Sequence, residues 1–268
     1  MKSRCRWKYA YSDYFDVTTG VKQGGVLSPQ IFTLYVDELI SRLPRCGVEC
    51  YFLSIFVACI MYADDLCLIA PTRSALQELL LICEEFSKEF CLSFNGKNSK
   101  ALLFGKTTFP IKAPVLNGDE IAFVDMWKYL GCSIVAGPRL TFSIKSELCA
   151  FYSSTNSILK SVMKPNELVL MNLLYSHCVP NLSYCAEVKE LSASSMSKCN
   201  VALNDSIRYI FSYNRWESTR FLRQQLNFPN VVEIFHARRR RFLKCNAESH
   251  NTIVRRITDL ILSLASSA

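Results

Sequence analysis

The stretch FVACIMYADDLCLIA, residues 56–70, places two adjacent aspartates between two apolar, β-rich runs. Apolar runs of this length, interrupted by a few polar residues, are typical of a β-hairpin. We therefore predict strands at 56–62 and 66–70, with Asp64 and Asp65 exposed at the turn. Two adjacent carboxylates in this position form either a solvated turn or a site for a hard divalent cation, since such cations prefer oxygen ligands. The spacing alone leaves both interpretations open.

The segments around this hairpin carry helical signals. Ser28 and Pro29 have the residue types of a helix N-cap and first turn, and apolar residues then recur at helical spacing over 29–43. A second amphipathic helix is predicted from Ser74 to about residue 90. Period-2 alternation or β-rich composition predicts further strands at 2–9 (half-buried), 14–18, 92–94, 101–104 and 128–134.

Asn117-Gly118 is the strongest short turn signal in the chain, because a type I′ turn needs positive φ at both central residues. It predicts a hairpin that joins 114–116 to 120–124. Beyond Gly137-Pro138 we expect helical periodicity only, with Pro165 opening a helix. The predicted fold class is α+β: an antiparallel sheet with helices packed on one face in residues 1–137, followed by an all-α region in residues 138–268.

Composition excludes several classes of protein. With 268 residues, of which 50% are hydrophobic, the chain has enough apolar side chains for a folded core. The 13 cysteines are scattered and odd in number, which favours a reducing compartment over a disulfide scaffold, and the three histidines do not have zinc-ligand spacing. The longest apolar stretch, 51–63, is shorter than the ~20 residues of a membrane span, so we expect no membrane partner.

Several motifs resemble those of one family. Residues 61–65 (MYADD) are similar to the aromatic-x-Asp-Asp motif of reverse transcriptases, and residues 20–29 (GVKQGGVLSP) resemble the motif that precedes it in the non-LTR (LINE-type) retrotransposon branch. Both occur in the family's order and at its interval, with the same helix between them. Residues 92–95 (LSFN), with the lysines that follow, resemble the next motif, and the helical remainder resembles a thumb and C-terminal region. One further segment resembles the primer-grip hairpin of this family: Trp127, Lys128, Tyr129, Leu130 and Gly131.

The resemblance implies a partial palm in residues 1–137 and a thumb in residues 138–268, acting as an RNA-directed DNA polymerase on an RNA template, a DNA primer and dNTP with two Mg²⁺ ions. Asp64 is then a direct Mg²⁺ ligand, Asp65 its less essential neighbour, and Tyr62 packs beside the primer end. In this family Gln23 and Gly24 lie against the nascent base pair, where the absence of a Cβ permits close approach. The alternative for Gly24 is a flexible turn before a helix.

Two departures from the family pattern bear on activity. The family's first catalytic aspartate lies upstream of a helix and a strand, and Asp13 and Asp16 are too close to Gly24 to leave room for them. At Asn98 the family has a lysine that is placed to protonate the pyrophosphate leaving group, which asparagine cannot do. Lys100 is a better substitute than Lys97, because neighbours on a strand point to opposite faces. We therefore expect the chain to be inactive by itself.

The formal charge of +8 favours polyanionic partners. Its densest cluster, Arg238, Arg239, Arg240 and Arg241, is either a solvated helix face or a contact with RNA phosphates. Three hypotheses follow: a polymerase fragment, a non-catalytic nucleic-acid-binding remnant or domesticated protein with the same fold, and an unrelated α+β protein with an accidental Asp-Asp turn. We expect an intracellular protein of the nucleus and/or cytoplasm, with the oligomeric state left open.

Overall fold

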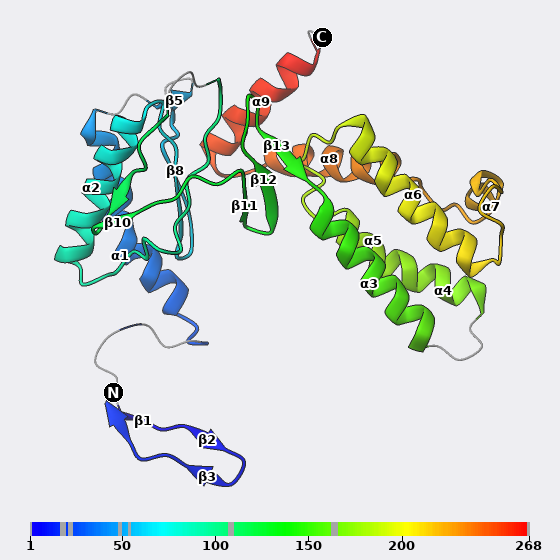
Figure 1. The fold of residues 1–268 in the computed structure, drawn as a ribbon, viewed down its shortest axis with the longest axis horizontal. Coiled ribbons are helices and arrows are strands. Elements are labelled where there is room, and N and C mark those ends of the chain that lie inside the picture. Colours follow the sequence, from blue (N-terminus) through cyan, green and yellow to red (C-terminus); the bar gives the residue numbers. More distant parts are fainter. Residues whose placement is uncertain are drawn as a thin grey trace. The chain divides into compact units, whose positions relative to one another are not determined.

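A computed structural model describes residues 2–16, 20, 24–47, 50–52, 55–106, 110–161 and 166–266. The chain folds as two compact units, each built from two segments of the sequence, and Figure 1 shows the elements of both. The first unit is Met1–Ser99 with Pro110–Ala122, and the second is Lys100–Phe109 with Phe123–Ala268. The boundaries between the units do not coincide with the boundary predicted near residue 138. The assignment of 1–137 to a palm and 138–268 to a thumb stays a prediction.

The helices confirm the two predicted in the first unit and the helical nature of the C-terminal half. Thr72, rather than Ser74, is the N-cap of the second helix, and its Oγ1 accepts from the Ala75 amide at 3.1 Å. Ser28 lies inside its helix, after Leu27 as the N-cap, and Gly47 (φ +75°) follows the last turn. The helical elements are α1 (Ser28–Arg42), η1 (Leu43–Cys46), α2 (Arg73–Glu89), α3 (Lys145–Ser161), α4 (Glu167–Leu173), η2 (Leu174–Cys178), α5 (Val179–Leu182), α6 (Ala193–Ile210), α7 (Arg220–Gln225), α8 (Val231–Ala247) and α9 (Thr252–Ser266).

The strands form several small antiparallel ladders, so the expected single sheet over residues 1–137 is wrong for the described residues. The strands are two to four residues long, and every pairing joins consecutive strands except that of β1 with β4, which encloses the β2–β3 pair. The pairs are β1 (Lys2–Ser3) with β4 (Phe15–Asp16), β2 (Arg6–Trp7) with β3 (Ala10–Tyr11), β5 (Tyr51–Phe52) with β6 (Ile55–Phe56), β7 (Cys59–Tyr62) with β8 (Asp65–Leu68), and β9 (Val115–Leu116) with β10 (Asp119–Glu120); β11 (Met126–Tyr129), β12 (Cys132–Val135) and β13 (Thr141–Ser143) form a three-stranded sheet.

Several predicted strands differ from the observed ones. Residues 92–94 form no ladder, and segment 101–104 makes only isolated bridges, at Ala101 and Phe104. Segment 2–9 belongs to an exposed hairpin and is not half-buried; Trp7 is 79% exposed. The predicted strand 128–134 is the β11–β12 hairpin, and β13 is a strand beyond residue 138, where only helices were expected. Pro165 lies outside the described residues.

The core of the first unit holds the Asp-Asp hairpin in place. Leu39 of α1 and Phe86 of α2 are fully buried together with Ala58, which precedes β7. Side chains of β7 and β8 pack against this cluster, so both helices cover one face of the hairpin, as the sequence predicts. In the second unit a larger core gathers side chains of α3 to α6 and α8. No helix in the part of the chain that the structure describes has the length and apolarity to cross a bilayer.

Candidate functional site

The turn between β7 and β8 has two residues, Ala63 and Asp64. Tyr62 pairs directly with Asp65 in the antiparallel ladder, so Asp65 is the first residue of β8 rather than a turn residue. Ala63 adopts a positive φ of 52° and Asp64 does not, so the turn is not of type I′, which needs positive φ at both central residues. The predicted hairpin is therefore confirmed, with only Asp64 at its tip.

Strand alternation places Asp65 away from the helices. Leu66 and Leu68 pack on the core that α1 and α2 form, and residues on either side of them point to the opposite face. Asp65 and its partner Tyr62, which is 64% exposed, therefore share the solvent-facing side of the hairpin. The carboxylate of Asp64 is exposed beside them at the turn.

These two carboxylates have the donor chemistry of a magnesium ligand set but form only part of one. Neither takes part in an ion pair or a side-chain hydrogen bond within the described part of the chain, so their oxygen atoms face solvent. No group of three or more His, Cys, Asp or Glu side chains among the described residues gathers to hold a metal ion. Hard oxygen donors fit Mg²⁺, and with two of them the remaining ligands would be water.

Gly24 lies just before α1 in a conformation that favours glycine. Its φ is +79°, and a Cβ placed on it would meet no atom within 4 Å. The turn continues with a hydrogen bond from the Ser28 amide to the Gly25 carbonyl at 3.2 Å. The backbone thus accounts for glycine here, and the space beside it is open on the protein side. Gln23 lies outside the described residues.

The segment after α2 is a turn rather than a strand. The Asn95 side chain accepts from the Asn98 amide at 3.1 Å, and the Asn95 carbonyl accepts from the Ser99 amide at 3.0 Å and from its hydroxyl at 2.9 Å. The argument that favoured Lys100 over Lys97 used strand alternation, and that premise is wrong. Lys97 is exposed and Lys100 is half-buried, and each has an interaction partner.

The predicted primer-grip residues do form a hairpin. β11 and β12 are joined by a two-residue turn of Leu130 and Gly131, both at positive φ (46° and 81°), with Tyr129 paired to Cys132. Trp127 and Lys128 are exposed on β11, and Trp127 is 39% exposed. A two-residue turn of this kind needs a residue that tolerates positive φ, which explains the glycine in the motif.

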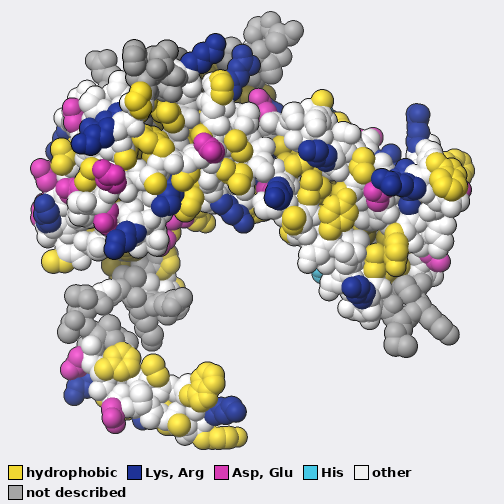
Figure 2. Space-filling model, viewed as in Figure 1, with side chains coloured by type: hydrophobic (Ala, Val, Ile, Leu, Met, Phe, Trp, Pro, Cys, Tyr) yellow, Lys and Arg dark blue, Asp and Glu magenta, His cyan; other side chains and the backbone are white. Residues whose placement is uncertain are grey.

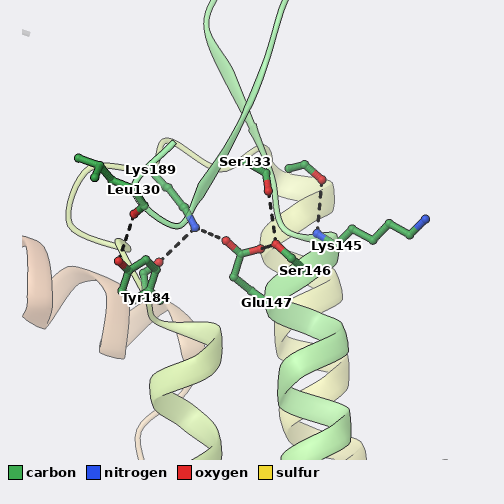
Figure 3. Close-up of polar contacts among 8 residues, drawn as sticks. Leu130, Ser133, Lys145, Ser146, Glu147, Tyr184 and Lys189 are labelled. Carbon is green, nitrogen blue, oxygen red and sulfur yellow. Dashed lines mark hydrogen bonds and ion pairs between the residues drawn. The ribbon is translucent and has the colours of Figure 1, made fainter. Parts of the chain in front are cut away.

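The turn of this hairpin contacts a polar cluster that the sequence did not predict (Figure 3). The Tyr184 hydroxyl donates to the Leu130 carbonyl at 3.1 Å. Lys189 forms an ion pair with Glu147 of α3, and its Nζ donates to the Tyr184 carbonyl at 3.2 Å. Ser146 donates to the other oxygen of Glu147 at 2.8 Å. No local sequence signal indicates these contacts, because Tyr184 is 54 residues from Leu130 and Lys189 is 42 residues from Glu147.

Burial and hydrogen bonding shift the pKa of Glu147 in opposite directions. Burial by itself raises the pKa of this carboxyl, but hydrogen bonds from Lys189 and Ser146 outweigh burial, and the pKa is lowered. The side chains of Lys189 and Glu147 are only 2% and 6% exposed. The Glu147 carboxyl is therefore held in its ionised form inside the second unit.

The arginine cluster of α8 divides into two parts. Arg238 contacts Glu187 at 2.7 Å and the Ser183 hydroxyl at 3.1 Å, and Arg239 lies 3.6 Å from Glu190. Arg240 and Arg241 are exposed, and neither forms an ion pair with another described residue. Figure 2 shows Lys and Arg side chains spread over the visible face rather than gathered in one patch. Only half of the cluster is thus available to a polyanion without breaking an ion pair.

Comparison with known proteins agrees with these features. Residues 5–134 match the family model described as reverse transcriptase (RNA-dependent DNA polymerase). The chain is 25% identical over 80% of its length to the RNA-directed DNA polymerase from mobile element jockey of Drosophila melanogaster, and 24% identical over 78% of its length to a Pol polyprotein from retrotransposable element R2 of Popillia japonica. It is also 25% identical over 94% of its length to the probable RNA-directed DNA polymerase from transposon BS of Drosophila melanogaster.

The chain spans only 24%, 35% and 29% of the length of these three relatives. The family match covers the Asp64 turn, Gly24 and the β11–β12 hairpin together. Residues 5–134 thus carry a reverse transcriptase domain, and most of the chain is similar to RNA-directed DNA polymerases of non-LTR (LINE-type) retrotransposons.

Proposed function

We propose that the chain is part of an RNA-directed DNA polymerase and supplies the carboxylate turn and the primer-grip hairpin of its catalytic region. The reverse transcriptase family depends on divalent metal ions and uses an RNA template, a DNA primer and dNTP. The observation that carries the proposal is the position of Asp64 at the tip of a two-residue turn, with Asp65 and Tyr62 paired beside it inside the matched region.

In this proposal the carboxylates hold the metal and the neighbouring residues hold the substrates. Asp64 is a direct Mg²⁺ ligand and Asp65 lies beside it, while the exposed ring of Tyr62 offers an apolar surface to the primer end. Mg²⁺ ions held there would supply activation of the 3′ hydroxyl and stabilisation of charge on the phosphates. Gly24 leaves its side of the site open for a base or ribose, and Gln23 is proposed to lie next to it.

We also propose roles for the basic residues. Lys100 is proposed to contact the nucleotide phosphates in place of the lysine that is absent at Asn98. Trp127, Lys128 and the turn that follows them would hold the primer backbone, and Arg240 and Arg241 would contact template or primer phosphates. An intracellular location, in the nucleus and/or cytoplasm, is proposed because the cysteines whose side chains the structure describes are all free thiols.

A second function is favoured by one specific observation. Among the described residues no third acidic side chain joins Asp64 and Asp65, and Asn98 is exposed in a turn where it cannot act as a general acid. A chain in this state is suited to bind nucleic acid without extending a primer. The alternative is therefore a non-catalytic nucleic-acid-binding remnant or domesticated protein with the same fold.

One assay with four outcomes separates these functions. The purified chain is tested for binding and extension of a DNA primer on an RNA template with Mg²⁺ or Mn²⁺, beside Asp64→Asn and a matched control, Asp259→Asn, which removes an exposed carboxylate on α9. We expect salt-sensitive binding that prefers a recessed 3′ end to a blunt duplex, with no extension. Extension that Asp64→Asn abolishes would show a complete polymerase. Binding without preference for the primer end would support the remnant, and absence of binding would contradict both functions.

A further inference from the structure

We propose that the connection Ser183–Glu190, between α5 and α6, anchors the turn of the β11–β12 hairpin, and that Tyr184 is a positioning residue for the primer grip. The inference rests on the proposed function, since it takes the hairpin to hold the primer. The name anchoring segment is used below for residues 183–190. Its own residues touch no proposed substrate; they act through Leu130 and Gly131.

The first step is the contact between Tyr184 and the hairpin turn. A Cβ placed on Gly131 would lie 2.6 Å from Cε1 and 2.9 Å from the hydroxyl oxygen of Tyr184. The ring therefore lies directly against the backbone of the turn, where no side chain fits. The same hydroxyl donates to the Leu130 carbonyl at 3.1 Å. Both residues of the turn are held by one tyrosine, and glycine is required at 131 for this close approach as well as for its φ of +81°.

The second step is that Tyr184 is itself fixed. Its carbonyl accepts a hydrogen bond from Lys189, whose ammonium group is paired with Glu147 of α3 out of contact with solvent (Figure 3). On the other side, Arg238 of α8 holds Ser183 at 3.1 Å and Glu187 at 2.7 Å. Of these contacts only the Lys189–Glu147 pair is buried, where hydrogen bonds to charged groups are strong; the Arg238 side chain is 42% exposed. The anchoring segment is thus tied to two helices, and its tyrosine reaches the hairpin from a rigid base.

Two further contacts join the helices and the hairpin. The hydroxyl oxygens of Ser133 on β12 and Ser146 on α3 lie 3.4 Å apart. Cys132, the first residue of β12, forms a hydrogen bond with Cys185. Burial is the main cause that raises the pKa of Cys132 to about 12, and this hydrogen bond is the second. Its thiol therefore remains neutral and packs as a small apolar group at physiological pH. These contacts restrain the hairpin on the β12 side of the turn.

The contact with Tyr184 matters because the backbone conformation of the turn is unfavourable without outside support. Leu130 has a Cβ and a φ of 46°, a backbone conformation that non-glycine residues seldom adopt unless the surroundings enforce it. Tyr184 contacts that residue directly. If the hydroxyl contact is lost, the turn samples other conformations more often, and the exposed side chains of Trp127 and Lys128 lose their fixed position relative to the primer.

The first arm of the test measures the anchor without nucleic acid. Tyr184→Phe removes the hydroxyl and keeps the ring, and Tyr209→Phe is the matched control, because Tyr209 is 70% exposed. We expect amide hydrogen exchange in 126–135 to become about two- to tenfold faster in Tyr184→Phe, the factor that corresponds to one hydrogen bond, and to remain unchanged in the control. Unchanged exchange in Tyr184→Phe would overturn the anchor.

The second arm asks whether the anchor acts through the hairpin. Affinity for a fluorescent DNA primer annealed to an RNA template is measured for Tyr184→Phe, Lys128→Ala and the double variant, with thermal unfolding as a check on folding. We expect each single variant to lose about two- to tenfold in affinity, and the double variant to lose little more than Lys128→Ala alone. Additive losses would overturn the positioning role, since Tyr184 would then act independently of the hairpin.

The two arms distinguish the inference from the proposed function. If Lys128→Ala binds as tightly as the unmodified chain, while exchange in Tyr184→Phe is accelerated, the anchor is real but the primer grip is not. That result would contradict the proposed role of the hairpin and the positioning role together. If Lys128→Ala weakens binding and exchange is unchanged in Tyr184→Phe, the primer grip survives and the anchor is contradicted.

Discussion

Tyr62 lies directly opposite Asp65 across the β7–β8 ladder, on the face of the hairpin that the helices leave uncovered. This pairing puts a large exposed ring and a carboxylate side by side at the base of the turn that carries Asp64. The two carboxylates are therefore presented by a rigid strand pair that a buried core supports. What they lack, within the described residues, is a third acid.

The first prediction concerns metal affinity. We expect the chain alone to bind Mg²⁺ only weakly, because two carboxylates of one turn leave most of the ion's six ligand positions to water. Calorimetric titration of the chain and of Asp64→Asn measures this. Tight binding that disappears in Asp64→Asn would show that another acid completes the site, and Asp259→Asn controls for general loss of negative charge.

The second prediction concerns the arginine cluster. Arg240→Gln combined with Arg241→Gln is expected to reduce the slope of log K against log[salt] for primed template by about one to two, because each phosphate contact contributes about 0.7 to 0.9. The Arg238 guanidinium already contacts Glu187. Arg238→Gln should therefore change the slope less and lower thermal stability instead. Binding titrations between low and moderate salt are the measurement. An unchanged slope in the double variant would favour a solvated helix face.

The third prediction concerns the buried ion pair. Lys189→Met alone should reduce the free energy of unfolding by about 3–5 kcal/mol, because it leaves the Glu147 carboxylate buried without its partner. Replacing both residues, Glu147→Leu with Lys189→Met, should recover much of that loss, since no charge then remains buried. Denaturant unfolding of Lys189→Met, Glu147→Leu and the double variant measures the difference. A double variant as unstable as the sum of the two single variants would show that the pair does not act as a unit.

The fourth prediction concerns acid stability. The folded-state pKa of Glu147 is lowered, so its stabilising contribution is present above the unfolded value of about 4.3 and is lost as the pH falls through the lower folded value. Unfolding free energy measured from pH 6 to pH 3 should therefore decline, and Glu147→Gln should show a smaller decline over the same range. Parallel curves for the two proteins would mean that other carboxyl groups account for the acid sensitivity.

Local sequence was sufficient for the features that neighbouring residues control. Asn117-Gly118 adopts positive φ at both positions (51° and 83°) and joins β9 to β10, as the dipeptide predicts. The Asp64 turn and the helices α1 and α2 were likewise predicted, because hairpins and amphipathic helices arise from the order of a few adjacent side chains. The strand predicted at 92–94 is absent because its backbone groups have other partners: the Leu92 amide donates to the Ser87 carbonyl of α2 at 3.0 Å, and the Phe94 carbonyl accepts from the Asn117 side chain at 3.5 Å.

The amino-acid sequence by itself therefore determined the reverse transcriptase motifs of residues 5–134, the Asp64 turn and the helices that support it. Only the tertiary structure decided which distant groups meet: Tyr184 on Leu130, Lys189 on Glu147, and the division of the arginine cluster between Arg238 and Arg240. Turns and helices depend on backbone preferences over a few residues, whereas a buried ion pair between residues 42 positions apart depends on how whole helices pack, which no local pattern encodes.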